Sequence, residues 1–262
     1  MSSLRDDGSQ SFYFFDIDDN LLFLTTRLYL WNAETGEELA ISSGDFAACQ
    51  PDLGRAGRWQ AWSVREATFR DFRDTPEVPP RERTFIKDLI AAIESGGDGW
   101  KGPSWPLLEH AAANQRAIAA VTARGHHPTT IEEGFRVLAE RGLIPSVPPI
   151  LGLYTVTNPE VRALVGAADP AMTVPSVKKL AIRHAVETAL DAYGRDLPHR
   201  FGMSDDDPGN VVLAISAMRD CKVAYPEKRF FVINTNHAEF VKLEVFAMDH
   251  PVTAAAKSTP LL

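Results

Sequence analysis

The sequence predicts an α/β protein built on a doubly wound parallel sheet, with a small, mainly helical unit inserted after the first strand. Three observations predict it. From residue 107 onward, helical patterns alternate with short apolar runs, as expected for parallel strands joined by helical crossovers. An aromatic run near the N-terminus ends abruptly in a cluster of acids. The 262 residues, 45% of them hydrophobic, suffice for one large core and a smaller accessory part.

The N-terminal third predicts one buried strand followed by a hairpin and two helices. Residues 11–15, SFYFF, are the first strand, and they stop at the sequence DIDDN. Residues 27–42 predict a hairpin in which Gly36 is available for a positive φ. Helices are expected over residues 59–72 and 81–95, separated by the breaker DTPEVPP.

The rest of the chain predicts the alternating core, and its last residues, from 250 onward, are expected to fray. Because sequential strands in such folds are parallel, their carboxyl ends should meet at one edge of the sheet. The predicted helices cover residues 107–115, 130–141, 176–193 and 210–219, and the predicted strands cover residues 117–122, 150–156, 199–204 and 229–234.

Composition excludes several classes of function. The formal net charge of -8 argues against a sequence-independent nucleic-acid binder, which needs a cationic surface. Cys49 and Cys221 are the only cysteines and stand far apart, so neither a disulfide framework nor a structural zinc site is expected. No apolar run has the length of a signal peptide or a membrane span. We therefore expect a cytoplasmic protein that binds a small molecule and contacts no membrane.

Chemistry-bearing residues follow three of the predicted strands. Asp16 and Asp18 follow the first strand and point the same way, and Thr122 ends the strand in AIAAVTARG. A run of three acids, residues 205–207, follows the strand in RFGMSDDDPGN. Between the last two lies Lys178, near the start of a predicted helix. These residues are distant in sequence, yet they should converge at one edge of a parallel sheet.

This order resembles the four motifs of the haloacid dehalogenase-like superfamily: a strand ending in D-x-D-x-T, a strand ending in Thr or Ser, a Lys, and a strand ending in acids. The resemblance covers residues 11–27 and 107–233. It implies a Rossmann-like core, placed here at residues 1–27 and 107–262, and a flap hairpin and cap at residues 28–106. The cap is assigned to that segment because 106 positions separate Asp16 from Thr122, whereas 56 separate Thr122 from Lys178.

The resemblance implies a magnesium-dependent phosphohydrolase that cleaves a phosphomonoester through a phospho-aspartyl intermediate. Asp16 would attack phosphorus. Asp18 would protonate the leaving group and then activate water. Thr122 would bind a phosphoryl oxygen, and Lys178 would neutralise charge. A carboxylate facing a phosphate dianion meets repulsion, which explains why a Lys and a divalent cation are needed.

The metal site implied by the resemblance consists of oxygen ligands, which suit Mg²⁺. Asp16 and the backbone carbonyl of Asp18 would bind the ion, and Asp205 and Asp206 would hold it directly or through water. The acid at Asp18 also favours phosphate esters over carbon-halogen or carbon-phosphorus bonds as the substrate class.

Several assignments stay open at the level of sequence. Lys179 competes with Lys178, and Asp207 competes with Asp205 and Asp206 for the metal. Asn20 replaces the usual Thr of the first motif, for which we expect an altered turn without lost chemistry. A D-x-D metal site of a glycosyltransferase, a phosphotransferase of the same fold and a non-catalytic or regulatory binding protein remain alternatives. The substrate and the oligomeric state are not predicted.

The loop after the second motif also carries polar residues. His126 and His127 are expected to serve a loop, because adjacent histidines point in different directions and no partner ligand is spaced for them. Arg124 has two open interpretations: it contacts a phosphate, or it is an exposed arginine that binds a neighbouring carboxylate.

Overall fold

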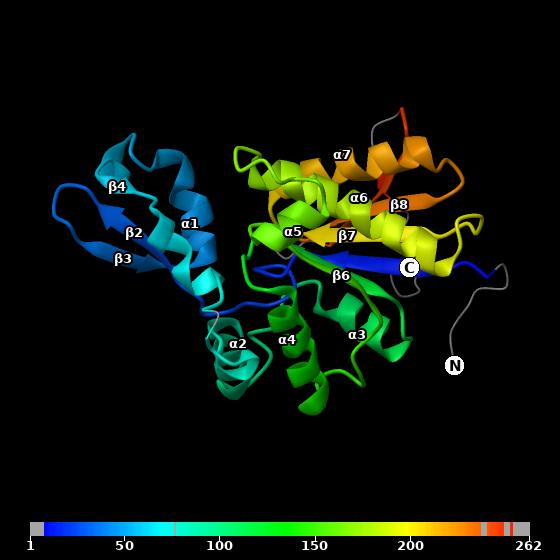
Figure 1. Ribbon diagram of the computed structural model, residues 1–262, viewed down its shortest axis with the longest axis horizontal. Helices are drawn as coiled ribbons and strands as arrows, with labels where there is room; N and C mark the ends of the chain where they lie inside the picture. The colour runs from blue at the N-terminus through cyan, green and yellow to red at the C-terminus, as the bar shows by residue number, and fades with distance from the viewer. Residues whose placement is uncertain (1–7, 76, 237–239, 249–251, 254–262) are drawn as a thin grey trace.

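Strand β1, Ser11–Phe15, lies at the centre of a seven-stranded sheet with the order β10-β9-β8-β7-β1-β5-β6 (Figure 1). The structure, a computed structural model, describes residues 8–75, 77–236, 240–248 and 252–253. Strands β6, β5, β1, β7 and β8 run parallel, β9 joins β8 antiparallel, and β10 joins β9 antiparallel. Their bounds are β5 Ile118–Thr122, β6 Ile150–Thr155, β7 Arg200–Asp205, β8 Arg229–Asn234, β9 Val241–Val245 and β10 Val252–Thr253.

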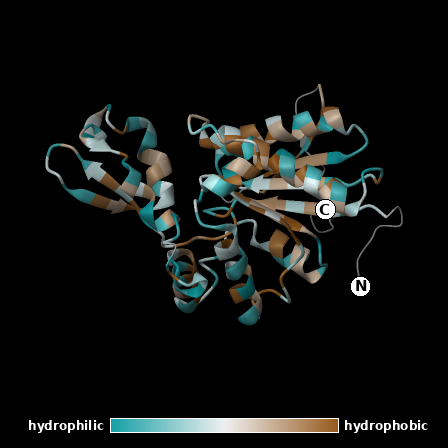
Figure 2. Cartoon of the chain, in the orientation of Figure 1, coloured by the Kyte–Doolittle hydropathy of each residue, from teal (hydrophilic) through white to brown (hydrophobic). Residues whose placement is uncertain are grey.

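Helices cover both faces of this sheet, so the central strands are buried on both sides. In β1, Phe12 and Phe14 pack with helices α6 and α7, whereas Tyr13 and Phe15 face α2, α3 and α4. In Figure 2 apolar residues gather along these strands and on the helices beside them. Burial on both faces explains why β1 and β5 are uninterrupted apolar runs. The helices are α2 Thr84–Glu94, α3 Trp105–Ala113, α4 Pro128–Glu140, α5 Pro159–Leu164, α6 Val174–Tyr193 and α7 Pro208–Ala224.

The order of the strands creates a crevice beside β1. From β1 the chain continues to β5 and β6 on one side, and it then returns to place β7 and β8 on the other side. In open α/β sheets, ligands bind at such a reversal, outside the carboxyl ends of the strands. The prediction of an α/β protein with a mostly parallel sheet between helices is confirmed.

Residues 28–72, here called the accessory unit, form a separate small sheet with short helices (Figure 1, left). The predicted hairpin is present, and Gly36 has a φ of 74°. Leu28, Leu30 and Ile41 pack with Cys49 and Phe72 in a hydrophobic cluster of their own. The elements are β2 Leu28–Asn32, β3 Glu38–Ile41, α1 Ser43–Cys49, β4 Trp62–Ser63, and the short 3-10 segments η1 Gln50–Asp52, η2 Gly57–Trp59 and η3 Glu66–Phe72.

The helix predicted over residues 59–72 is wrong. Trp62–Ser63 instead adds a third strand by pairing with β2, and a 3-10 helix, η3, follows it. Pairing with a strand about 30 positions earlier overrides the local helical pattern, because tertiary contacts outweigh propensity. The helix α1 was not predicted, although Ser42 caps it by accepting a hydrogen bond from the Asp45 amide.

The segment between the accessory unit and α3 packs on the main core. The 3-10 helix η4, Pro80–Glu82, leads into α2. Phe85 and Leu89 of α2 belong to the same hydrophobic cluster as Phe15, and Trp100 and Trp105 join that cluster too. Hydrophobic packing therefore divides the predicted insertion, residues 28–106, into the accessory unit and a part that covers one face of the sheet.

The remaining differences lie at the ends of elements and at one edge of the sheet. Helix α7 is longer than predicted at both ends, and α5 and β9 were not predicted. Of the tail expected to fray, the structure describes only Val252–Thr253, which form β10; the rest lies outside the described residues. Among the described residues, no helix combines the length and apolar character required to cross a bilayer.

Candidate active site

Asp16, Lys178 and Asp205 form a buried ionic group at the carboxyl edge of the sheet. Asp16 follows β1 and Asp205 ends β7, and these strands are neighbours, so the two carboxylates face the same crevice. Lys178, in the first turns of α6, reaches between them. Its Nζ atom lies 2.9 Å from Asp16 Oδ1 and 3.3 Å from Asp205 Oδ2. The structure thus brings together three predicted site residues from three segments.

This group sets one ammonium against two carboxylates. Burial raises the pKa of Asp16 well above its usual range despite the nearby ammonium of Lys178. Burial likewise raises the pKa of Asp205. For Lys178, burial alone would lower the pKa, but the charges of Asp16 and Asp205 outweigh burial and raise it. One ammonium between two buried carboxylates leaves an excess of negative charge, which a divalent ion would offset.

Asp206 completes a set of three carboxylates, here called the carboxylate triad: Asp16, Asp205 and Asp206. One oxygen from each lies within 4.8 Å of the others. Burial and the charge of Asp205 raise the pKa of Asp206 to about 7. Oxygen donors from two segments, beside excess negative charge, fit a hard cation such as Mg²⁺.

Lys179 and Asp207, the sequence neighbours that competed with the assigned lysine and acids, bind elsewhere. Lys179 Nζ contacts Ser216 Oγ at 3.0 Å and Asp220 Oδ2 at 2.8 Å, so Lys178 is the lysine at the site. Asp207 caps α7 by accepting a hydrogen bond of 2.8 Å from the Asn210 amide. The Asp207 amide in turn donates to Asp205 Oδ1 at 3.1 Å. Asp207 therefore orients Asp205 through its backbone and stands outside the triad.

Asp18 turns toward Arg124. Nη2 of Arg124 lies 2.6 Å from Asp18 Oδ1, and Nε lies 3.0 Å from Oδ2. The Arg124 side chain is fully buried, so the alternative of an exposed arginine is wrong, although the contact with a carboxylate that this alternative named is present. The sequence signal for Arg124 was only its place two residues after the end of β5.

Thr122 lies at the same edge, buried as the last residue of β5. Its hydroxyl oxygen accepts a hydrogen bond of 3.3 Å from the Arg124 amide. The loop that starts here carries Arg124 and His126, both buried. His126 is more than a loop residue, because it contacts Arg124 and Asp74.

Asn20 ties four segments together at this edge. Its Nδ2 donates to the carbonyl oxygens of Asp16 at 2.9 Å and Ser204 at 3.1 Å. Its Oδ1 accepts from Ser104 Oγ at 2.7 Å and Thr235 Oγ1 at 2.8 Å. A threonine has a single donor, so it could not make this set of bonds. The change from the family pattern thus creates a structural crosslink that sequence reasoning missed.

A cleft of about 510 Å³ opens next to the carboxylate triad. Asp206 lines it on one side, and Asp19, Phe23, Lys101 and Asn236 form much of the rest. Asp19 has a φ of 59°, which turns the chain away from β1 here. The cleft is large enough for a small organic ligand.

Comparisons of the chain with protein-family models, with curated proteins and with solved structures gave no match. The function is therefore argued from the geometry of the site. That geometry joins a buried carboxylate, a buried ammonium, three carboxylates close enough to share a metal ion, and a cleft.

Proposed function

We propose that this chain is a Mg²⁺-dependent phosphohydrolase of the haloacid dehalogenase-like superfamily that cleaves a small phosphomonoester at Asp16. The observation that supports this most is the contact of Lys178 with both Asp16 and Asp205, with Asp206 beside them. If residues 205–207 formed only a solvated turn, no buried ammonium would be expected between Asp205 and Asp16. Phosphoryl transfer to a carboxylate requires that the residues of all four motifs meet, as they would at the carboxyl edge of this sheet.

In the first half-reaction, a carboxylate oxygen of Asp16 forms a bond to phosphorus as the ester P–O bond breaks. Asp18 gives a proton to the departing oxygen. Mg²⁺, held by the carboxylate triad when bound, would offset the repulsion between the carboxylate and the phosphate dianion. Lys178 fixes Asp16 and adds positive charge beside it.

In the second half-reaction, water attacks phosphorus of the aspartyl phosphate. Asp18, now deprotonated, takes the proton from this water, and the P–O bond to Asp16 breaks to release phosphate. Thr122 is assigned to a phosphoryl oxygen because it ends β5 beside β1. The leaving group is assigned to the cleft beside Asp206.

The accessory unit is proposed as the cap. It lies at the carboxyl edge of the main sheet (Figure 1), and Ser43 of α1 lies near Asp19, where its side chain opposes the rise in the pKa of Asp19 that burial causes. A unit in this position can exclude bulk water during phosphoryl transfer.

The deciding experiment separates Asp16 from Asp18. With an aryl phosphate and Mg²⁺, Asp16→Asn should abolish turnover, because no covalent intermediate can form. Asp18→Asn should still become phosphorylated, since a good leaving group needs little protonation. Hydrolysis of its aspartyl phosphate should slow by roughly 10²- to 10⁴-fold. Acid quench and mass spectrometry of a tryptic digest should place the phosphoryl group on the peptide containing Asp16.

Two results would overturn this mechanism. One is a phosphoryl group on a His or Ser of the digested protein. The other is an Asp16→Asn protein with the full activity of the parent. Activity that survives removal of all divalent ions would count against the role given to the carboxylate triad.

A further inference from the structure

Arg124 has an unusual environment for an arginine. Its side chain is fully buried, and its guanidinium lies over the rings of Phe72 and Phe85, 4.5 and 5.0 Å from their centroids. A buried guanidinium without partners would be very costly, because it carries charge and five N–H donors. Its hydrogen bonds should therefore be specific.

The partners of Arg124 fix the guanidinium in one plane. Nε and Nη2 bind both oxygens of Asp18 in the bidentate geometry that suits a carboxylate. Nη2 also donates to Thr26 Oγ1 at 3.1 Å, and Nη1 lies 3.2 Å from His126 Nε2. Each nitrogen of the guanidinium thus has a partner.

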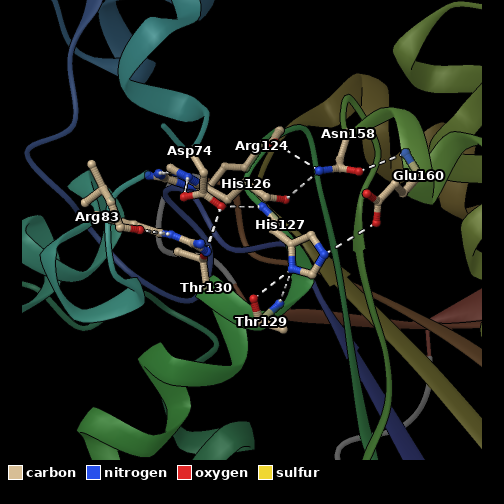
Figure 3. Close-up of polar contacts among 11 residues, drawn as sticks. Asp74, Arg83, Arg124, His126, His127, Thr129, Thr130, Asn158 and Glu160 are labelled. Atoms are coloured by element: carbon tan, nitrogen blue, oxygen red, sulfur yellow. Dashed lines mark hydrogen bonds and ion pairs between the residues drawn. The ribbon is translucent and has the colours of Figure 1, made fainter. Parts of the chain in front are cut away.

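The contact with Arg124 sets the tautomer of His126. Arginine is only a donor, so His126 Nε2 accepts and Nδ1 carries the proton. Nδ1 then donates to Asp74 Oδ1 at 3.0 Å (Figure 3). Burial lowers the pKa of His126, and the charge of Arg124 adds to that effect, in keeping with a neutral ring.

Asp74 is held as firmly as Arg124. Its Oδ2 accepts from the His127 amide at 2.6 Å and from Thr130 Oγ1 at 2.7 Å, and Arg83 Nη1 lies 3.3 Å away (Figure 3). Asp74, His126, Arg124 and Asp18 therefore form a continuous chain of contacts, here called the Asp74–Asp18 chain.

The Asp74–Asp18 chain begins where the polypeptide leaves the accessory unit. The carbonyl of Phe72 accepts a hydrogen bond of 2.9 Å from the Gly125 amide, and Arg73 forms a parallel bridge with Gly125. A Cβ on Gly125 would lie 2.8 Å from Thr157 Oγ1 and 3.2 Å from Arg73 Cγ, so the loop packs closely against both side chains. The same loop thus joins the accessory unit to the arginine beside Asp18.

We infer that Arg124 is a positioning residue for Asp18, and that His126 and Asp74 hold Arg124 in place. This role rests on the proposed function, in which Asp18 must give and later accept a proton in one orientation. Oδ1 of Asp18 accepts from both Nη2 and Nε of Arg124, whereas Oδ2 accepts from Nε alone. Oδ2 therefore keeps a lone pair that can hold or accept a proton while Arg124 fixes the carboxylate. A small displacement of a catalytic side chain lowers the reaction rate by a large factor.

The test uses Arg124→Lys, which keeps the positive charge but loses the bidentate fork. For an alkyl phosphate, whose leaving group needs protonation, kcat/KM should fall by about 10- to 100-fold. For 4-nitrophenyl phosphate, whose leaving group does not, kcat/KM should change by less than about threefold, while phosphoenzyme accumulates. In an Asp18→Asn background, Arg124→Lys should add no further loss with either ester.

One further variant is a control for the loss of a bidentate arginine, and another replaces Arg124→Lys if that protein does not fold. Arg229→Lys breaks a bidentate pair with Glu244 at the opposite edge of the sheet and should alter neither substrate's kcat/KM. If Arg124→Lys does not fold, His126→Gln should show the same dependence on leaving group at smaller magnitude. A double-mutant cycle of Arg124→Lys and Asp18→Asn in urea should show an interaction factor of about tenfold in the unfolding equilibrium constant.

Equal losses for the two esters, or a loss that persists in the Asp18→Asn background, would overturn the positioning role while leaving the proposed function intact. An interaction factor below about twofold in the double-mutant cycle would also overturn the positioning role, even without the kinetic measurements. A wild-type chain that hydrolyses neither ester and forms no phosphoenzyme would overturn the proposed function, and the positioning role with it.

Discussion

Lys178 and Asp16 meet through an ammonium to carboxylate contact of 2.9 Å, and both side chains are buried. Lys178→Gln would leave two buried carboxylates without this charge. Activity should fall by at least about 100-fold, and the free energy of unfolding by about 3 kcal/mol. Lys179→Gln, which alters a partly exposed pair with Asp220, should change unfolding by less than about 1 kcal/mol and keep activity. Kinetics and urea denaturation of the two variants check this.

Asp205 and Asp207 should differ in metal binding. Asp205→Asn removes a carboxylate of the triad and should weaken Mg²⁺ binding by at least about tenfold, as measured by calorimetry. Asp207→Asn keeps a good helix cap and should bind Mg²⁺ like the parent. Equal affinity in both variants would show that Asp205 does not hold the ion.

His126 should make stability depend on pH. Burial lowers its pKa below the ordinary value of 6.5, so below about that pH the unfolded chain binds more protons than the folded one. Stability is then fully present above pH 6.5 and is lost as the pH falls. Between pH 7.5 and pH 5.5 the parent should lose more free energy of unfolding than His126→Gln. Parallel urea titrations at the two pH values measure the difference, and identical losses would contradict it.

Replacement of Asn20 by an acidic residue should destabilise the folded protein. Asn20→Asp replaces the donors to the carbonyls of Asp16 and Ser204 with oxygens that repel them. We expect a loss of about 3 kcal/mol or more, because two buried acceptors lose their partner. Asn20→Thr, which keeps one donor, should lose less. Denaturation of both variants tests the order, and a milder loss for Asn20→Asp would be evidence against the crosslink.

Gly102 should be required for the approach of its loop to the turn at Asn20 and Leu21 that follows β1. A Cβ there would lie 2.3 Å from the carbonyl oxygen of Asn20, and backbone atoms cannot move aside easily. Gly102→Ala should therefore destabilise the protein by about 1–3 kcal/mol. Gly99→Ala, which meets no atom within 4 Å, should stay within about 0.5 kcal/mol of the parent. Melting temperatures compared at one pH give the answer.

The main sheet could be predicted from sequence because its central strands are short, mostly apolar runs that alternate with helical patterns. The accessory unit could not, since its strand β4 exists through pairing with β2. Trp62–Ser63 carry no pattern of their own that favours a strand over the helix predicted there.

The candidate site could be predicted where it depends on strand ends. Asp16 and Asp205 meet because the carboxyl ends of parallel neighbours lie together, and the choice of Lys178 over Lys179 follows from the face of α6. The pairing of Arg124 with Asp18 could not be predicted, because 106 positions separate them and only the packing of the loop after β5 turns the arginine inward. No local pattern encodes such a contact.

The central place of β1 has a consequence for biosynthesis. Ser11 pairs with Arg200, which the ribosome adds 189 positions later. At typical rates of synthesis this is a delay of about 10 to 40 s, during which a strand with two aromatic faces has one edge unsatisfied. Strand β1 therefore waits for β7 long after its own synthesis before it has both neighbours. Protection of this nascent segment by chaperones would therefore bear directly on the yield of folded protein.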